Sequence, residues 1–93
     1  MTFLDVVDRA KRFTSGMEDL ESFTTWIKSA QGDLDGSELP EIGKTLEGMR
    51  MRIAEYKRLV GWTRPNLDWH ITKFIENQED MVGGGGGREQ DVT

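Results

Sequence analysis

The chain has 93 residues, with 12 Lys and Arg, 17 Asp and Glu and a formal net charge of −5. This length fits a single domain, and the negative net charge argues against a surface that coats nucleic acid as a whole. Cysteine is absent, which excludes disulfides and thiolate metal sites.

The hydropathy of the chain gives no sign of a membrane segment. No stretch approaches the roughly 18 consecutive apolar residues that span a bilayer, and the segment from Met1 to Asp5 lacks the apolar core of a secretory signal. We therefore expect a soluble, cytoplasmic protein without membrane contact.

The N-terminal segment predicts a helix over about residues 2–30. Thr2 and Asp5 have nearly the spacing of a capping box, and apolar residues then recur at alternating steps of three and four, as in a helix packed lengthwise on another. Ser15-Gly16 lies within this pattern, so the segment is either one helix or two helices broken at this pair. The unbroken heptad phase favours one continuous helix.

A turn is expected between residues 31 and 38, which are rich in Gly, Asp and Ser. Ser37 is a candidate N-cap, and Pro40 suits the first turn of the helix that follows.

The clearest pattern predicts a second helix over about residues 38–62. Its apolar residues follow one another at steps of three and four over three heptads, which indicates a coiled-coil-like seam that packs against another helix. The predicted packing or oligomer seam consists of Leu39, Ile42, Leu46, Met49, Ile53, Tyr56 and Val60.

A third, shorter helix is expected over residues 65–81, because Pro65 suits a first helical turn and Thr63 can cap it. Residues 83–93 begin with five glycines, and we predict a disordered tail because glycine loses the most backbone entropy on ordering. No segment alternates as a strand would. The predicted class is all-α: an antiparallel long helical hairpin plus a shorter third helix, completed to a bundle by dimerisation.

The sequence offers no convincing catalytic, cofactor or metal site. Gly43-Lys44-Thr45 is similar to the end of a phosphate-binding loop, but Glu38 stands where the first glycine is required. His70 is the only histidine, and no Ser or Cys nucleophile accompanies it at a recognisable spacing. We expect neither an enzyme nor a cofactor.

Tryptophan is abundant for so short a chain, and it is enriched among binding hot spots. The first two tryptophans fall at outward heptad positions, where the third helix could cover them; otherwise they mark an interface. The candidate interface consists of Trp26, Trp62 and Trp69.

Basic residues concentrate near the end of the second helix, where Glu55 is the one acid among five cations. In the predicted hairpin, Arg50 faces Glu21, while Lys57 and Arg64 lack partners, although Arg64 could stack on Trp62. The candidate contact for nucleic acid or an acidic partner consists of Arg50, Arg52, Lys57, Arg58 and Arg64.

Three functions follow as hypotheses. The leading one is a self-associating helical adaptor, regulator or assembly factor, a homodimer with an unidentified protein partner. The alternative is binding to the backbone of a nucleic-acid duplex through the basic stripe 50–64. In its plan of two long helices and a short helix opened by Arg64-Pro65, the chain resembles the dimeric double-stranded-RNA-binding silencing suppressors of nodaviruses, and the resemblance implies duplex RNA binding.

The third hypothesis is an acidic protein, of the kind some phages encode, that occupies the DNA-binding surface of a host protein. The carboxylates that would supply the charge are Asp5, Asp8, Glu18, Asp19 and Glu21.

Overall fold

The computed structural model describes residues 2–34, 40–59 and 61–84. In these segments the chain forms four α-helices and no strand, so the predicted all-α class is confirmed. No helix in the described part of the chain combines the length and the apolar character needed to cross a membrane. The elements are α1 Phe3–Thr14, α2 Leu20–Asp33, α3 Pro40–Arg58, α4 Arg64–Glu79 and a five-residue π-helical turn, η1, Asp80–Gly84.

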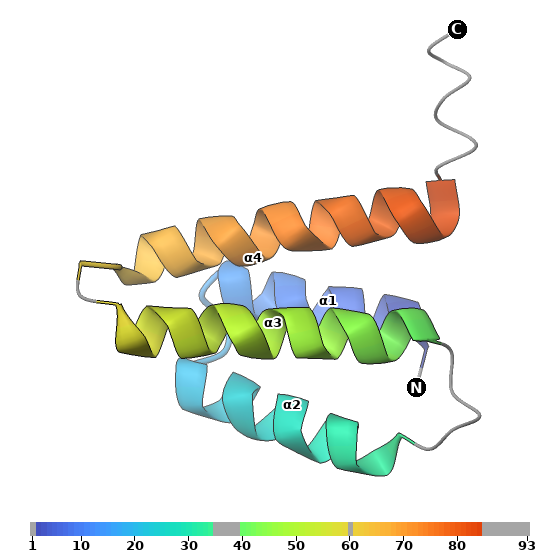
Figure 1. The fold of residues 1–93 in the computed structure, drawn as a ribbon, viewed down its shortest axis with the longest axis horizontal. Helices are drawn as coiled ribbons and strands as arrows, with labels where there is room; N and C mark the ends of the chain where they lie inside the picture. The colour runs from blue at the N-terminus through green and yellow to red at the C-terminus, as the bar shows by residue number, and fades with distance from the viewer. Residues whose placement is uncertain (1, 35–39, 60, 85–93) are drawn as a thin grey trace, which may run out of the picture.

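Successive helices run in opposite directions (Figure 1). α3 lies between α2 and α4, and α1 packs behind α3 and α4. Each helix contributes apolar residues spaced three or four apart to one common core, as expected for amphipathic helices. The buried apolar residues are Val6, Val7, Ala10, Phe13, Phe23, Ile27, Ala30, Ile42, Leu46, Met49, Ile53, Leu67, Ile71 and Ile75.

The predicted continuous helix over residues 2–30 is wrong, because the chain turns between Thr14 and Leu20. Gly16 adopts a left-handed backbone with φ of +87°, which glycine tolerates without steric cost. The Asp19 carboxylate then accepts a hydrogen bond from the Ser22 backbone N–H at 2.7 Å and begins α2 as its N-cap. The apparent heptad phase was misleading, since Met17 is 72% exposed.

The expected caps of α1 and α4 are present. Thr2 and Asp5 form a reciprocal capping box at the start of α1. Thr63 caps α4 together with Asn66, and Pro65 lies in the first turn. The proposed Ser37 cap lies outside the described residues.

The long hairpin of the sequence prediction is not the observed arrangement. α3 contacts α1, α2 and α4 instead of pairing lengthwise with one long helix. The plan shared with the nodaviral suppressors, two long helices and one short one, is therefore replaced by four helices.

The predicted seam of α3 lies inside this single chain. Ile42, Leu46, Met49 and Ile53 are buried in the common core, and Tyr56 is partly buried against it. Leu39 and Val60 lie outside the described residues. Because these four side chains are already buried within one chain, they are not available to pack against a second copy.

Helical geometry continues beyond Met81, the predicted end of the third helix, because the turn η1 follows α4 directly. The π-helical turn η1 carries helical geometry through Gly83 and Gly84, the first two residues of the glycine run. The rest of the predicted tail, residues 85–93, lies outside the described residues.

α3 and α4 pack closely at Gly48. A Cβ atom built on Gly48 would lie 2.1 Å from Cζ of Phe74, so this position requires glycine unless the ring moves. One helical turn earlier, the buried Thr45 hydroxyl donates to the Glu41 carbonyl at 2.7 Å and lies 3.1 Å from Oε1 of Gln78.

We predict opposite effects for two glycine substitutions in α3. G43A should raise the free energy of unfolding by about 0.5–1 kcal/mol, because alanine is the better helix former and, among the described residues, the added Cβ would meet only Leu34, at 3.8 Å. G48A should lower it by about 1–2 kcal/mol, because displacement of Phe74 outweighs the same gain. Urea unfolding of both variants measures this, and a stabilising G48A would contradict the close approach of α3 and α4.

We also predict that the Asp19 cap contributes to acid sensitivity. Its hydrogen bond from the Ser22 backbone N–H holds the pKa of Asp19 below its ordinary value, so the stabilisation is complete above that value and is lost as pH falls through the folded-state pKa. D19N keeps a capping oxygen at every pH. Its unfolding free energy should therefore fall less steeply than that of wild type between about pH 5 and pH 2. Parallel slopes in denaturant titrations would refute this role.

Candidate interaction surface

An aromatic cluster of three side chains lies where α3 passes into α4. The rings of Trp62 and His70 stack with centroids 4.5 Å apart and an interplanar angle of 3°. The Trp69 ring meets His70 edge-on, with centroids 5.0 Å apart and an angle of 85°. We refer to Trp62, Trp69 and His70 as the aromatic cluster.

Local backbone geometry positions this cluster. Gly61 has a φ of +103°, a conformation that turns the chain sharply after α3 and that glycine adopts readily. Thr63 then caps α4 and fixes its first turn, and Trp69 and His70 follow on that helix. Trp62 precedes the helix and lies back against His70.

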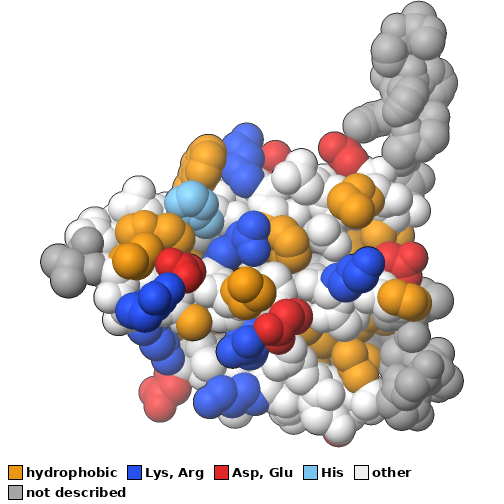
Figure 2. Space-filling model, in the orientation of Figure 1, with side chains coloured by type: hydrophobic (Ala, Val, Ile, Leu, Met, Phe, Trp, Pro, Cys, Tyr) orange, Lys and Arg blue, Asp and Glu red, His pale blue; other side chains and the backbone are white. Residues whose placement is uncertain are grey.

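The rings of the cluster pack on one another, and one of them is accessible to solvent. Trp62 and His70 are partly buried, whereas Trp69 is 56% exposed. The Lys73 Nζ atom lies 6.0 Å from the Trp69 ring centroid, at the outer limit of a cation–π contact. Figure 2 shows hydrophobic side chains interspersed with Lys and Arg on the face formed by α2, α3 and α4.

Trp26, the third predicted interface residue, lies away from this cluster. It sits on α2, stacks on Phe23 with ring centroids 5.9 Å apart, and lies beneath the Arg9 guanidinium at 5.1 Å. Arg9 is held in turn by Glu18, whose Oε1 accepts from its Nε at 2.8 Å. The structure thus brings together two of the three tryptophans.

The predicted basic stripe is largely engaged in ion pairs within the chain. Arg50 donates from Nε to Glu47 at 2.9 Å and not to Glu21, so that predicted pair is wrong. Arg58 pairs with Glu55. Lys57 is exposed and has no ion pair with the residues described.

The two remaining arginines of the stripe stabilise helix contacts. Arg64 bonds Asp68 at 3.0 Å, donates to the Phe13 carbonyl at 3.2 Å and lies 4.1 Å from the Phe13 ring centroid. The suggested stacking of Arg64 on Trp62 is therefore replaced by stacking on Phe13. Arg52 lies 4.2 Å from the ring centroid of Phe74, and burial lowers the pKa of its guanidinium.

Several of the carboxylates proposed for DNA mimicry already cap helices or form an ion pair within the chain. Asp5 and Asp19 cap α1 and α2, and Glu18 is paired with Arg9. Their charge is thus shared with backbone amides and a guanidinium, which weakens their combined field.

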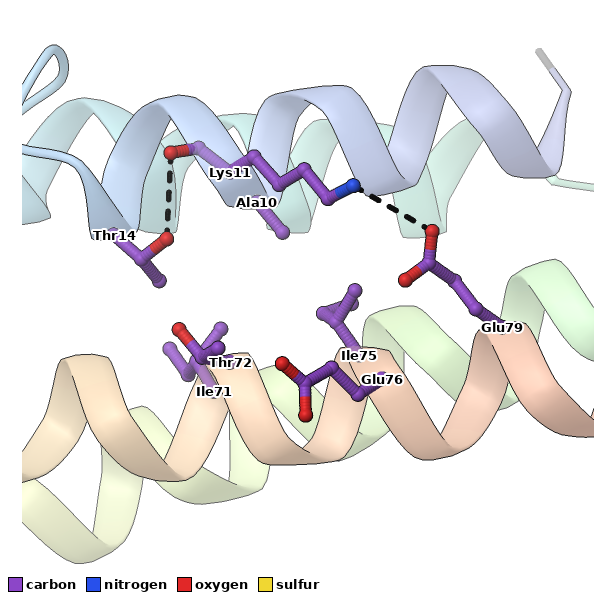
Figure 3. Close-up of a pocket in the computed structure, with 8 residues that line it drawn as sticks. All are labelled: Ala10, Lys11, Thr14, Ile71, Thr72, Ile75, Glu76 and Glu79. Carbon is purple, nitrogen blue, oxygen red and sulfur yellow. Dashed lines mark hydrogen bonds and ion pairs between the residues drawn. The ribbon is translucent and has the colours of Figure 1, made fainter.

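A small pocket lies between α1 and α4 (Figure 3). Ala10, Ile71 and Ile75 form its apolar side, and Lys11 reaches Glu79 across it at 3.6 Å. Its volume of about 120 Å³ is below the roughly 300–1,000 Å³ typical of small-molecule sites. Within the three described segments, no group of three His, Cys, Asp or Glu side chains is placed to hold a metal ion.

Sequence reasoning found both tryptophans of the cluster but missed His70 as the ring that joins them. The sequence did contain a signal, because Trp62 lies just before the predicted helix start and Trp69-His70 lie two turns into that helix. A capping residue and a proline at the helix start can place a preceding side chain against the first turns of the helix. Comparisons with protein-family models, curated proteins and solved structures found no match to this chain.

We predict that the two tryptophans differ in their contribution to stability. W69A should change the free energy of unfolding by less than about 0.5–1 kcal/mol, as is usual for exposed positions. W62A should cost about 1–2 kcal/mol, because it removes a stacked aromatic pair and partly buried surface. Urea unfolding with a W62A/H70A double-mutant cycle measures the coupling, and equal costs for W62A and W69A would refute the difference.

Proposed function

We propose that the protein is a non-enzymatic helical interaction module that binds a protein partner through the aromatic cluster. The observation that carries this proposal is the 56% exposure of Trp69 beside an ordered Trp62–His70 stack. Tryptophan gives large contact energies when a partner covers it. The stack holds the surrounding surface in place before binding, which lowers the entropic cost of association.

The charges of this region favour a protein partner over a nucleic-acid backbone. Three arginines of the predicted stripe, Arg50, Arg58 and Arg64, already pair with carboxylates, which lowers the net positive charge that they offer to a phosphate backbone. Phosphate binding depends on unneutralised cations, and the chain as a whole carries −5. Nucleic-acid binding is therefore the weaker alternative.

A site-specific crosslinking experiment tests the proposal. Trp69 is replaced by a photoreactive phenylalanine derivative, and the variant is irradiated in an extract of the native source. We expect a protein adduct that excess wild-type chain suppresses and excess W69A does not. L4A, which truncates another exposed apolar residue on α1, is the matched competitor and should suppress the adduct as wild type does.

Three results would contradict the proposal. These are the absence of an adduct, equal competition by W69A and L4A, and the same adducts when the photoreactive residue replaces Leu4. An adduct that nuclease removes would instead support the nucleic-acid alternative.

A further inference from the structure

Arg52 is held on the side of α3 that faces α4. Its Nη1 atom donates a hydrogen bond to the Gly48 carbonyl at 3.0 Å, and its guanidinium lies 4.2 Å from the ring centroid of Phe74 on α4. Phe74 also packs against Gly48, where the two helices lie close together. Because the hydrogen bond and the ring contact restrain the guanidinium, a ligand that binds it has less side-chain entropy to overcome.

Among the residues that the structure describes, no carboxylate pairs with Arg52. Glu55, one helical turn later, bonds Arg58 instead. Glu47, on the preceding turn, bonds Arg50. Burial lowers the pKa of the Arg52 guanidinium, and no attraction from an acid opposes this effect. A ligand that supplies a carboxylate would therefore stabilise the charged form of this side chain.

One edge of the Arg52 guanidinium is open. Nη1 bonds the Gly48 carbonyl, whereas Nε and Nη2 have no hydrogen bond to the described residues. No fully buried side-chain nitrogen in the described segments lacks a hydrogen bond, so both atoms are in contact with solvent. The Nε and Nη2 N–H groups form a planar fork that can bind both oxygens of one carboxylate.

This arginine lies beside the aromatic cluster. His70 and Phe74 are four residues apart on α4, which places them on one helix face, about 6 Å apart along the axis. Trp62 stacks on the first of these rings, and the Arg52 guanidinium lies over the second. Figure 2 shows Lys and Arg side chains beside the histidine, which is drawn in pale blue. One bound segment can thus contact both the cluster and the open edge of Arg52.

We propose that the partner segment that covers the aromatic cluster is acidic, and that one of its carboxylates binds the Nε–Nη2 edge of Arg52 while an apolar side chain covers Trp69. This inference rests on the proposed function and adds the chemical class of the partner. The acid and the apolar residue would be about two to four positions apart, because two extended residues or one helical turn span this distance.

The charge near the cluster supports an acidic partner. Residues 50–73, which include the cluster and Arg52, contain six Lys and Arg but two Asp and Glu, although the whole chain carries −5. Attraction of an acid is therefore confined to this part of the surface. A single open guanidinium edge suits an isolated carboxylate, whereas a nucleic-acid backbone is bound by several unpaired cations together.

Selection from a phage-displayed library of short random peptides, with the full chain as bait, tests the proposal. We expect the enriched peptides to carry Asp or Glu about two to four positions from an apolar residue. W69A and R52Q should each weaken binding of a selected peptide at least about tenfold in fluorescence polarisation. R52K should weaken it at least about threefold, because lysine keeps the charge but lacks the fork. Circular dichroism confirms that each variant is folded.

The matched control is K57Q. Lys57 is another exposed cation of α3 without an ion pair to the described residues, but it lies beside α2, near Leu20 and Thr24. K57Q removes the same charge as R52Q and should leave binding within about twofold of wild type.

A change in the peptide separates a direct contact from a structural role of Arg52. Replacing the acidic residue of the selected peptide by its amide should weaken binding to wild type about tenfold and binding to R52Q less than about twofold, because only wild type loses a charged pair. A purely structural role of Arg52 would give equal losses for both chains.

Equal losses would therefore overturn the inference, and so would enriched peptides without acidic residues or the absence of any enriched peptide. Binding that W69A weakens and R52Q does not would overturn the inference and leave the proposed function standing. Binding that R52Q weakens and W69A does not would support the carboxylate site and contradict the proposed role of the aromatic cluster.

Discussion

The architecture depends on one corner, where three helices are held together around Phe13. The ring of Phe13 stacks on Phe23 of α2 with centroids 4.3 Å apart. The Arg64 guanidinium, at the start of α4, lies 4.1 Å from the same ring and bonds the Phe13 carbonyl. An aromatic stack and a cation–π contact on one side chain fix the end of α1, the start of α2 and the start of α4.

This corner explains why α2 lies beside α3 and α1 lies behind it. Without the turn at Gly16, the first 33 residues would form a rod that could cover α3 along only one side. With the turn, α1 and α2 each contribute a separate apolar face, and α3 is enclosed by α1, α2 and α4. On the outward side of α3, Met51 remains 54% exposed.

Several elements could be read from the sequence because their causes are local. The caps at Thr2 and Thr63 depend on side chains three residues apart, and four of the predicted α3 seam residues are buried, as their spacing requires. The break after Thr14 was missed because apolar residues 13, 17 and 20 are spaced by four and three, as in one continuous helix. In the fold, however, Met17 is exposed and does not pack in the core. The pairing of Arg50 with Glu47 was missed for a related reason: an i,i+3 pair on one helix forms without the long-range geometry that the Glu21 pair needed. The stack of Trp62 on His70 depends on the backbone of Gly61, which spacing alone does not reveal.

The turn η1 has a practical consequence for anyone who labels this protein. It carries helical geometry to Gly84, at the opposite end of α4 from the α3–α4 connection (Figure 1). At ~1.5 Å per residue, Gly84 lies roughly 22 Å along the helix from Trp69. A fluorophore or affinity handle attached after Gly84 would thus lie beyond the end of α4 that is remote from Trp62 and Trp69. Immobilisation through that end would leave these two side chains facing the solution.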